Sequence, residues 1–280
     1  MEQQFTTTIT SKRKWFDFNL KELFRYRDLI FLFVRRTFVS QYKQTILGPA
    51  WAIIQPLMTT VVLTVVFGNI AGLAPSGVPS FAFYLCGSIA WTYFSACLTT
   101  TSNTFTANAS ILGKVYFPRL VMPVSSVISQ LISFGIQFVF FLAFLLYYWI
   151  TGANVQPNVW VLMTPVFLVH MALLSLGVGV IISAMTTKYR DLAMVVGFGV
   201  QLWMYATPVA YDISMIPEQF LDLYMLNPVT PIIAMFRYAF LGAGEPCWGA
   251  YGVSWAVTAV VLFVGILLFN RVEKTFMDTV

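Results

Sequence analysis

The sequence predicts an all-α membrane protein with six transmembrane helices, an N-terminal amphipathic helix at the membrane interface and short re-entrant helices between the fifth and sixth spans. Composition is the first observation behind this prediction. Of the 280 residues, 59% are hydrophobic and only 10% are charged, whereas about a quarter of the residues of a soluble domain are charged. In addition, long uncharged stretches separate the charged residues, and the basic residues recur in alternate segments.

The uncharged stretches locate the spans, because a charge in the bilayer core costs about 2.5 to 3.5 kcal/mol on insertion scales. None of the 70 residues between Lys43 and Lys114, or of the 68 between Arg119 and Lys188, is acidic or basic. A spanning helix needs about 20 apolar residues, so each stretch holds two helices joined by an external turn. Two further stretches, of 20 and 25 residues, hold one helix each. The predicted spans are 50–72, 82–104, 124–149, 159–186, 192–211 and 250–270.

The basic residues predict the orientation of these spans. Of the 16 Lys and Arg residues, 15 lie before the first span, in two alternate connectors or after the last span, and cytoplasmic loops carry such an excess. We therefore expect a cytoplasmic N-terminus (1–49), a six-helix transmembrane domain (50–270) and a cytoplasmic tail (271–280) in the cell inner (plasma) membrane. The net charge of +5 then reflects topology and does not indicate nucleic-acid binding.

The segment before the first span has the pattern of a basic amphipathic helix, which is suited to the inner leaflet of a membrane. Arg27 falls within its apolar stripe, which indicates packing on more than one side. Two roles remain open for this helix, an anchor and a gate. The apolar stripe consists of Leu20, Leu23, Phe24, Phe31, Val34 and Phe38.

The connector 106–119, between the second and third spans, is apolar and aromatic where a solvated turn would be polar. Such a surface is hidden by a membrane or by a partner protein, and we favour a docking site for a partner. Pro118 is expected to end a short helix here. The residues assigned to this docking site are Ile111, Leu112, Gly113, Lys114, Val115, Tyr116, Phe117 and Arg119.

The outer segment 212–249 is too long for a turn and contains four prolines. Its apolar piece 232–241 has the length of a re-entrant or interfacial segment and is too short to cross a bilayer. We therefore expect short helices that dip into the outer leaflet.

Aromatic residues make up 17% of the chain, and several lie within spans or near their ends. Trp and Tyr commonly form belts at the membrane interface, which is one interpretation. The other is a conduit for a polysaccharide, because the C–H faces of sugars stack on flat rings and sugar hydroxyls bond to Tyr oxygens. The candidate conduit residues are Trp51, Tyr84, Trp91, Tyr93, Trp203, Tyr205 and Tyr211.

Catalytic and energy-coupling motifs are missing from the sequence. The single histidine, His170, lies in the middle of a span without a charged neighbour, and Gly113-Lys114 lacks the remainder of a phosphate loop. No zinc-ligand spacing and no pairing pattern among the three cysteines is visible, and the spans contain no further group for an ion relay. We therefore expect no enzyme activity, no metal and no cofactor in this chain, with energy supplied by another protein.

Three motifs resemble the permease subunits of type-2 ABC exporters for bacterial surface polysaccharides, the Wzm-type O-antigen permeases and their teichoic-acid and capsule relatives. They lie at 35–57, 108–123 and 207–238, and 188–191 is also similar to the family's connector after the fourth span. The 108–123 motif, which ends in Phe-Pro-Arg-Leu-Val-Met-Pro, is the most specific.

The resemblance implies a half-transporter. Two copies of this chain would form a channel, and two copies of a separate cytoplasmic ABC ATPase, which binds ATP and Mg²⁺, would drive export of a lipid-linked glycan, O-antigen before teichoic acid or capsule. The connector would couple to that ATPase, and the outer segment would form the periplasmic rim. The N-terminal helix would flank the cytoplasmic entrance with Arg25, Arg27, Arg35 and Arg36.

Three alternatives remain beside this one. A permease for a drug or small lipid would share the same architecture. An intramembrane glycosyltransferase would need an acidic or histidine cluster, which the sequence does not offer. A structural scaffold would need neither an apolar connector nor re-entrant helices.

Overall fold

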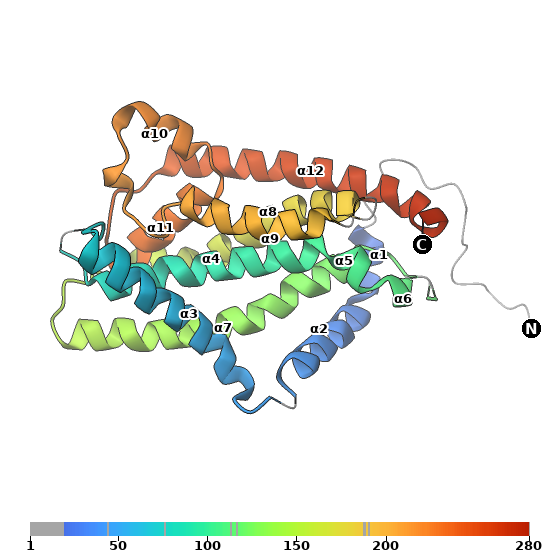
Figure 1. Cartoon of the computed structure of the whole chain (residues 1–280), viewed down its shortest axis with the longest axis horizontal. Helices are drawn as coiled ribbons and strands as arrows, with labels where there is room; N and C mark the ends of the chain where they lie inside the picture. The colour runs from blue at the N-terminus through green and yellow to red at the C-terminus, as the bar shows by residue number, and fades with distance from the viewer. Residues whose placement is uncertain are drawn as a thin grey trace, which may run out of the picture.

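The computed structural model describes residues 20–43, 45–75, 77–112, 114–115, 117–186, 189 and 191–279, although it leaves undescribed the side chains of 20–22, 109, 112, 270 and 272–279. Within the described residues all regular structure is helical (Figure 1). The α-helices are α1 (Leu20–Arg25), α2 (Arg27–Tyr42), α3 (Trp51–Leu63), α4 (Ser80–Ser102), α5 (Thr104–Ala107), α6 (Ala109–Leu112), α7 (Val121–Ile150), α8 (Thr164–Thr186), α9 (Leu192–Tyr205), α10 (Glu218–Met225), α11 (Val229–Leu241) and α12 (Trp248–Thr279). Shorter or irregular helices are η1 (Gly48–Ala50), η2 (Thr64–Ile70), η3 (Val159–Met163) and η4 (Ile213–Met215).

Five helical segments of the described chain are long and apolar enough to cross a membrane. They coincide with the first, second, third, fourth and sixth predicted spans, within a few residues at each end. Their bounds are Gly48–Ile70, Ser80–Ser102, Val121–Ile150, Val159–Thr186 and Trp248–Phe269. The sequence therefore located these five elements correctly.

The fifth predicted span, 192–211, is represented by a shorter helix. α9 has 14 residues, about 21 Å of helix at 1.5 Å per residue, against a hydrocarbon core of about 30 Å. The helix ends at Tyr205, three residues before Pro208, whose ring disfavours helical geometry at the residue before it. The chain then continues through turns to Tyr211.

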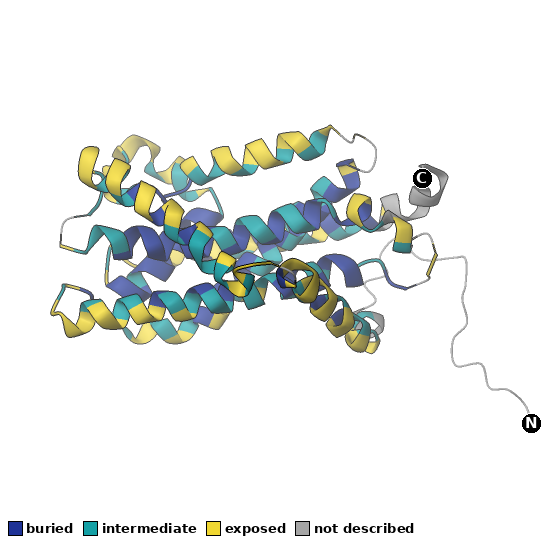
Figure 2. Ribbon diagram, turned by 60° about the horizontal axis from the view of Figure 1, so that its bottom comes forward, coloured by how far each residue is buried: buried dark blue, intermediate teal, exposed yellow. Residues whose placement is uncertain are grey.

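α4 is the central helix of the bundle. It packs against α3, α7, α8 and α11, while α8 packs in turn against α12. Small residues allow these close approaches: a Cβ added at Gly179 of α8 would lie 2.6 Å from Thr101, and one at Gly177 would lie 2.9 Å from the backbone of Leu262 in α12. Buried residues are accordingly concentrated in the central helices (Figure 2).

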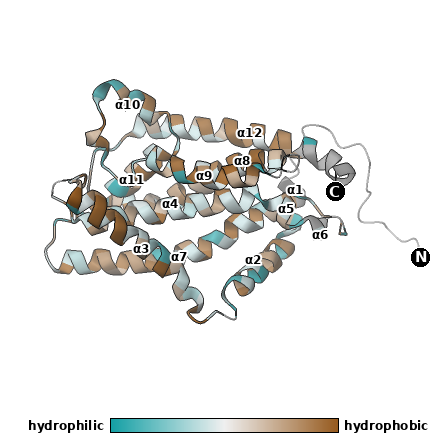
Figure 3. Ribbon diagram, in the orientation of Figure 1, coloured by the Kyte–Doolittle hydropathy of each residue, from teal (hydrophilic) through white to brown (hydrophobic). Residues whose placement is uncertain are grey.

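The outward surface of the bundle is apolar, as expected where lipid replaces water. α3, α9 and α12 carry mostly hydrophobic residues, whereas α2 and α10 carry a mixture of hydrophilic and hydrophobic ones (Figure 3). Exposed apolar side chains on α3, η2, α9 and α12 include Val62, Val65, Phe198, Val260 and Phe263.

The N-terminal segment forms α1 and α2, and α2 packs against α7. Ile30 and Val34 are buried against this helix and its neighbours, and the Tyr42 and Ser133 hydroxyls lie 3.0 Å apart. Arg25, Arg27, Arg35 and Arg36 are all exposed. Protein covers only part of the predicted apolar stripe, because Phe24 and Phe31 are exposed by 72% and 66%.

The outer segment forms the short helices that the sequence predicts, α10 and α11. They differ in environment. α10 contains no buried residue, whereas 11 of the 13 residues of α11 are buried, with α4, α8, α12 and η3 around it. Protein therefore surrounds α11 almost completely, which is a condition for non-spanning backbone at membrane depth.

Candidate functional site

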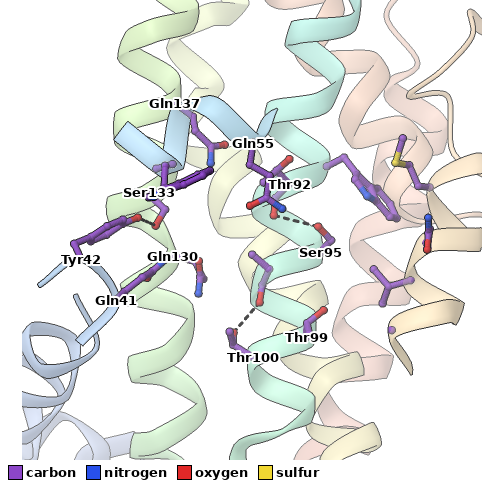
Figure 4. A pocket seen from close by; sticks show the side chains of 18 residues that line it. Gln41, Tyr42, Gln55, Thr92, Ser95, Thr99, Thr100, Gln130, Ser133 and Gln137 are labelled. Atoms are coloured by element: carbon purple, nitrogen blue, oxygen red, sulfur yellow. Dashed lines mark hydrogen bonds between the residues drawn. The ribbon is translucent and has the colours of Figure 1, made fainter. Parts of the chain in front are cut away.

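A cavity of about 610 Å³ lies between α2, α3, α4, α7 and α9 (Figure 4). We call it the polar groove. Among the described residues that line it, none is charged, five are glutamines and two are tryptophans. The lining consists of Gln41, Tyr42, Trp51, Ala52, Gln55, Trp91, Thr92, Ser95, Ala96, Thr99, Thr100, Gln130, Ser133, Gln137, Gly197, Val200, Gln201 and Met204.

Helical periodicity brings these side chains to one place. α4 contributes residues at positions i, i+1, i+4, i+5, i+8 and i+9, from Trp91 to Thr100, and α7 contributes Gln130, Ser133 and Gln137 at i, i+3 and i+7. Both spacings keep side chains on one face of a helix of 3.6 residues per turn. The polar groove is thus a polar stripe on two spanning helices, closed from the sides by α2, α3 and α9.

The hydroxyl and amide groups of the polar groove differ in what they offer a ligand. Ser95 donates to the Thr92 carbonyl at 3.2 Å and Thr100 to the Ala96 carbonyl at 2.7 Å, so their oxygens remain as acceptors. The amide of Gln137 is buried, and its Oε1 has no partner among the described residues. A buried acceptor without a donor costs about 1 to 3 kcal/mol, which a ligand hydroxyl would offset.

Of the seven aromatic residues proposed for the conduit, the structure places Trp51 and Trp91 in the polar groove. Trp51 is 52% exposed and Trp91 is 6% exposed, so one ring is accessible and the other forms part of the wall. Tyr84 and Tyr93 lie instead in the core of the bundle, with at most 2% of their surface exposed.

The remaining three, Trp203, Tyr205 and Tyr211, lie at the C-terminal end of α9 and in the turn that follows it. Trp203 Nε1 donates to Asn227 Oδ1 at 3.0 Å, and the Tyr211 hydroxyl donates to the Tyr205 carbonyl at 2.8 Å. The Tyr211 and Tyr224 hydroxyls also contact each other. Burial and this hydrogen bond raise the pKa of Tyr224 above its ordinary value, so the phenol is neutral. Trp203 and Tyr224 line a separate cavity of about 530 Å³.

The glutamines and hydroxyls of the polar groove were not identified from the sequence. Their signal was nonetheless present, because Gln130, Ser133 and Gln137 recur at helical spacing in a largely apolar span. Polar residues within spans usually face the interior of a bundle or a water-filled cavity, and this rule would have found them.

Arg237 on α11 is a further residue that the sequence did not explain. Its side chain is 3% exposed and lies 3.6 Å from the centre of the Phe83 ring. The guanidinium donates to the carbonyls of Pro208 and Val209, the latter at 2.8 Å, and no ion pair with a described carboxylate satisfies it. Arg237 therefore ties the turn after α9 to α4 and α11.

The connector 106–119 is partly anchored and partly free. Phe117 is buried and its ring lies 5.9 Å from that of Phe33 in α2. Ile111 is half-buried, Arg119 is half-buried, and Lys114 and Val115 are exposed, the latter by 58%. Gly113, Tyr116 and the side chain of Leu112, which belong to the same predicted site, lie outside the described residues.

The contacts of His170 indicate a role in helix packing. Its Nε2 lies 3.0 Å from the Thr258 hydroxyl and 3.2 Å from that of Ser254, and its ring stacks on Trp255 with 4.0 Å between centroids. These contacts join α8 to α12. Across the described residues, no group of three or more His, Cys, Asp or Glu side chains could hold a metal ion.

A comparison with known families identifies the architecture. The model of the ABC-2 type transporter family matches residues 28–241, which run from α2 to the end of α11 and include the whole polar groove. The chain belongs to the ABC-2 type transporter family. It is thus a multi-pass membrane protein of an ABC transport system.

Relatives of this ABC-2 type chain include an O-antigen export system permease protein from Klebsiella pneumoniae, 27% identical over 93% of this chain and 97% of the relative. A protein with the same name from Myxococcus xanthus is 25% identical over 93% of this chain and 98% of its own length. A polysialic acid transport protein from Escherichia coli is 22% identical over 90% and 95%, respectively. The chain therefore matches these transporters over nearly their full length.

Proposed function

We propose that this chain is the membrane-spanning permease subunit of an ATP-driven exporter that moves a lipid-linked polysaccharide, most closely of the O-antigen type, from the cytoplasm across the inner membrane. Full-length similarity to polysaccharide exporters supports the substrate class. The single observation that carries the proposal is the chemistry of the polar groove, which combines glutamine amides, hydroxyls and two tryptophans without a charge.

This chemistry matches a neutral glycan. Each sugar hydroxyl both donates and accepts, as a glutamine amide does, and the C–H face of a sugar ring stacks on an indole such as that of Trp51. A pocket for a drug or small lipid would instead be lined mainly by apolar side chains. The uncharged lining of the polar groove therefore favours the glycan over this alternative.

A capsule polymer is the second candidate, because one relative is named for polysialic acid. Polysialic acid carries a carboxylate on every sugar. The described lining of the polar groove contains no Lys or Arg to meet such charges, and an uncompensated charge in a partly desolvated site is costly. A neutral O-antigen is the better match.

The assembly follows from the open side of the polar groove. Trp51 and Gln55 on α3 and Gln201 on α9 are exposed, and none of the 14 residues of α9, all of which the structure describes, is buried. A second copy of the chain on this side would enclose the polar groove and cover α9. We therefore propose a homodimer around a shared conduit, with α9 and its following turn as the fifth of six spans and both termini in the cytoplasm.

The ATPase is proposed to be a separate cytoplasmic subunit in two copies, which binds ATP and Mg²⁺, because this sequence has no phosphate loop. Connector residues 106–119 would receive its motion. Phe105 stacks on Phe269 of α12 at 4.6 Å, and Phe117 packs on α2, so a displacement of the connector would reach two helices at once.

The test of this function is a comparison of two tryptophans. Trp51→Ala removes a half-exposed indole in the polar groove, whereas Trp149→Ala removes one that is 65% exposed on the outer surface of α7. We expect Trp51→Ala to lower the rate at which glycan appears on the cell surface by roughly threefold to tenfold, the worth of one ring contact, and Trp149→Ala to leave it unchanged.

Surface glycan is measured by pulse labelling, and the amount of each variant in the membrane by immunoblot. If the wild type and both variants export glycan at the same rate, the polar groove is not part of the transport path. A loss with Trp149→Ala as large as that with Trp51→Ala would assign both rings to a general structural role.

A further inference from the structure

A second cavity, of about 290 Å³, lies between α2, the first turns of α7 and the residue that joins α5 to α6. Its polar lining includes Arg36, Thr37 and Ser40 from α2 and Asn108 from the connector, and Phe33 and Met122 add apolar surface. Arg36 is the only charged residue among the described residues that line it, and none of them is acidic. The cavity therefore combines one cation with hydroxyl and amide groups.

Hydrogen-bond donors in this cavity remain available for a ligand. Arg36 makes no ion pair with a described residue, and Thr37 and Ser40 of the same helix line the cavity beside it. Asn108 uses one amide hydrogen on the Thr104 carbonyl at 3.0 Å, which leaves its second hydrogen. Ser125, by contrast, already donates to the Met122 carbonyl, so the donors come from α2 and Asn108.

The cavity adjoins the polar groove, because Gln41 lines both. The two sites differ in charge. The smaller cavity contains the Arg36 guanidinium, whereas the described lining of the polar groove is neutral. A molecule with a phosphate at one end and a neutral glycan beyond it would match this order. The exposed apolar residues Phe31, Leu32 and Val39 on α2 would keep this end of the site at a membrane surface.

We propose that this cavity binds the phosphate group of a membrane lipid, with Arg36 as the charged contact and Thr37, Ser40 and Asn108 as hydrogen-bond donors. An Arg side chain presents several N–H groups to phosphate oxygens, and the absence of carboxylates from the described lining leaves an anion unopposed. The inference rests on the proposed function, because a phosphate-linked glycan is the ligand that would use the cavity and the polar groove together.

The test is calorimetric titration of the full-length chain in a neutral detergent. The probes are farnesyl diphosphate, farnesol, inorganic diphosphate and short-chain phosphatidylglycerol. We expect farnesyl diphosphate to bind, farnesol to fail and inorganic diphosphate to bind more weakly. Saturable binding of phosphatidylglycerol with equal affinity would also support a lipid-phosphate site, and would identify phospholipid headgroups as its source.

Two neighbouring arginines supply the matched control. Arg36→Gln should weaken farnesyl diphosphate binding roughly tenfold or more, the worth of a charge-assisted hydrogen bond, and Arg36→Lys should restore part of it. Arg35→Gln removes the same charge from an exposed position outside the cavity, and should have little effect.

Equal weakening by Arg35→Gln and Arg36→Gln, or none by either, would overturn the site. Inorganic diphosphate binding as tightly as farnesyl diphosphate would overturn the assignment to a lipid. Neither result would contradict the proposed export function, because the two tryptophan variants test that function by a separate measurement.

Discussion

Gly87 and Arg237 depend on each other. A Cβ at Gly87 would collide with the Arg237 guanidinium, which lies over Phe83 and donates to the carbonyls of Pro208 and Val209. Burial of a cation without a carboxylate partner costs free energy unless hydrogen bonds and an aromatic face replace its hydration. The missing side chain at Gly87 provides the space in which this replacement is possible.

Gly87→Ala is therefore expected to destabilise the chain. The added methyl group displaces the guanidinium from its carbonyl partners, and we expect a loss of about 1.5 to 3 kcal/mol, the worth of a hydrogen bond to a charged group. Gly135→Ala in α7 is the matched control, because nothing lies within 4 Å of its added Cβ, and Ala is the better helix former by about 1 kcal/mol.

Thermal unfolding of the two variants in the same detergent is the measurement. The midpoint should fall for Gly87→Ala and remain or rise for Gly135→Ala. A midpoint unchanged by Gly87→Ala would show that the Arg237 contacts contribute little to stability.

Among the secondary-structure elements, the connector 106–119 combines an anchored residue with a free one. Phe117 is buried against α2, whereas Val115, two residues earlier, is 58% exposed. An exposed apolar side chain next to an anchored one suits a rigid docking surface. The structure therefore separates two effects that the sequence could not separate: the stability that Phe117 supports, and the partner binding that we propose for Val115.

Val115→Asp is predicted to weaken association with the ATPase subunit roughly tenfold or more, as loss of an apolar interface anchor does, and to abolish export. The variant should still insert and unfold at the wild-type temperature, because the side chain lies outside the core. Co-purification with the ATPase is the measurement. Val159→Asp, at an exposed position at the start of η3, should co-purify normally. If the Val115→Asp variant also co-purifies normally, the coupling site lies elsewhere.

For the molecule as a whole, topology decides whether α9 crosses the membrane. Asn154 precedes α8 and Glu218 follows α9. Since α8 belongs to a segment long enough to cross, the two residues reach the same side only if α9 crosses as well. Each is exposed. Cysteine replacements at these positions can therefore count the spans.

We predict that Asn154→Cys and Glu218→Cys react with an impermeant thiol reagent in intact cells, and that Lys43→Cys reacts only after permeabilisation. The native Cys247 is half-buried on the outer segment, so the experiment uses a Cys247→Ser background. Cys86 and Cys97 are buried and should not react with the reagent. Labelling of Asn154→Cys but not Glu218→Cys would mean five spans and an outer segment on the cytoplasmic side.

The sequence by itself determined where the chain enters and leaves an apolar environment. Five spans and the outer helices α10 and α11 follow from the spacing of charges and prolines, because the cost of a charge in lipid acts residue by residue and needs no tertiary information. The same local signals made the connector 106–119 recognisable, and the family comparison agrees with the resemblance read from the motifs.

Only the tertiary structure decided which face of each span meets protein and which meets lipid. Lipid is as apolar as a protein core, so hydrophobicity does not distinguish the two faces. Trp91 and Tyr93 illustrate this, since they stand two residues apart on α4, yet one lines the polar groove and the other is enclosed in the core. A local pattern contains the polar stripe of α7, but the enclosure of the polar groove and the environment of Arg237 arise from contacts between distant segments.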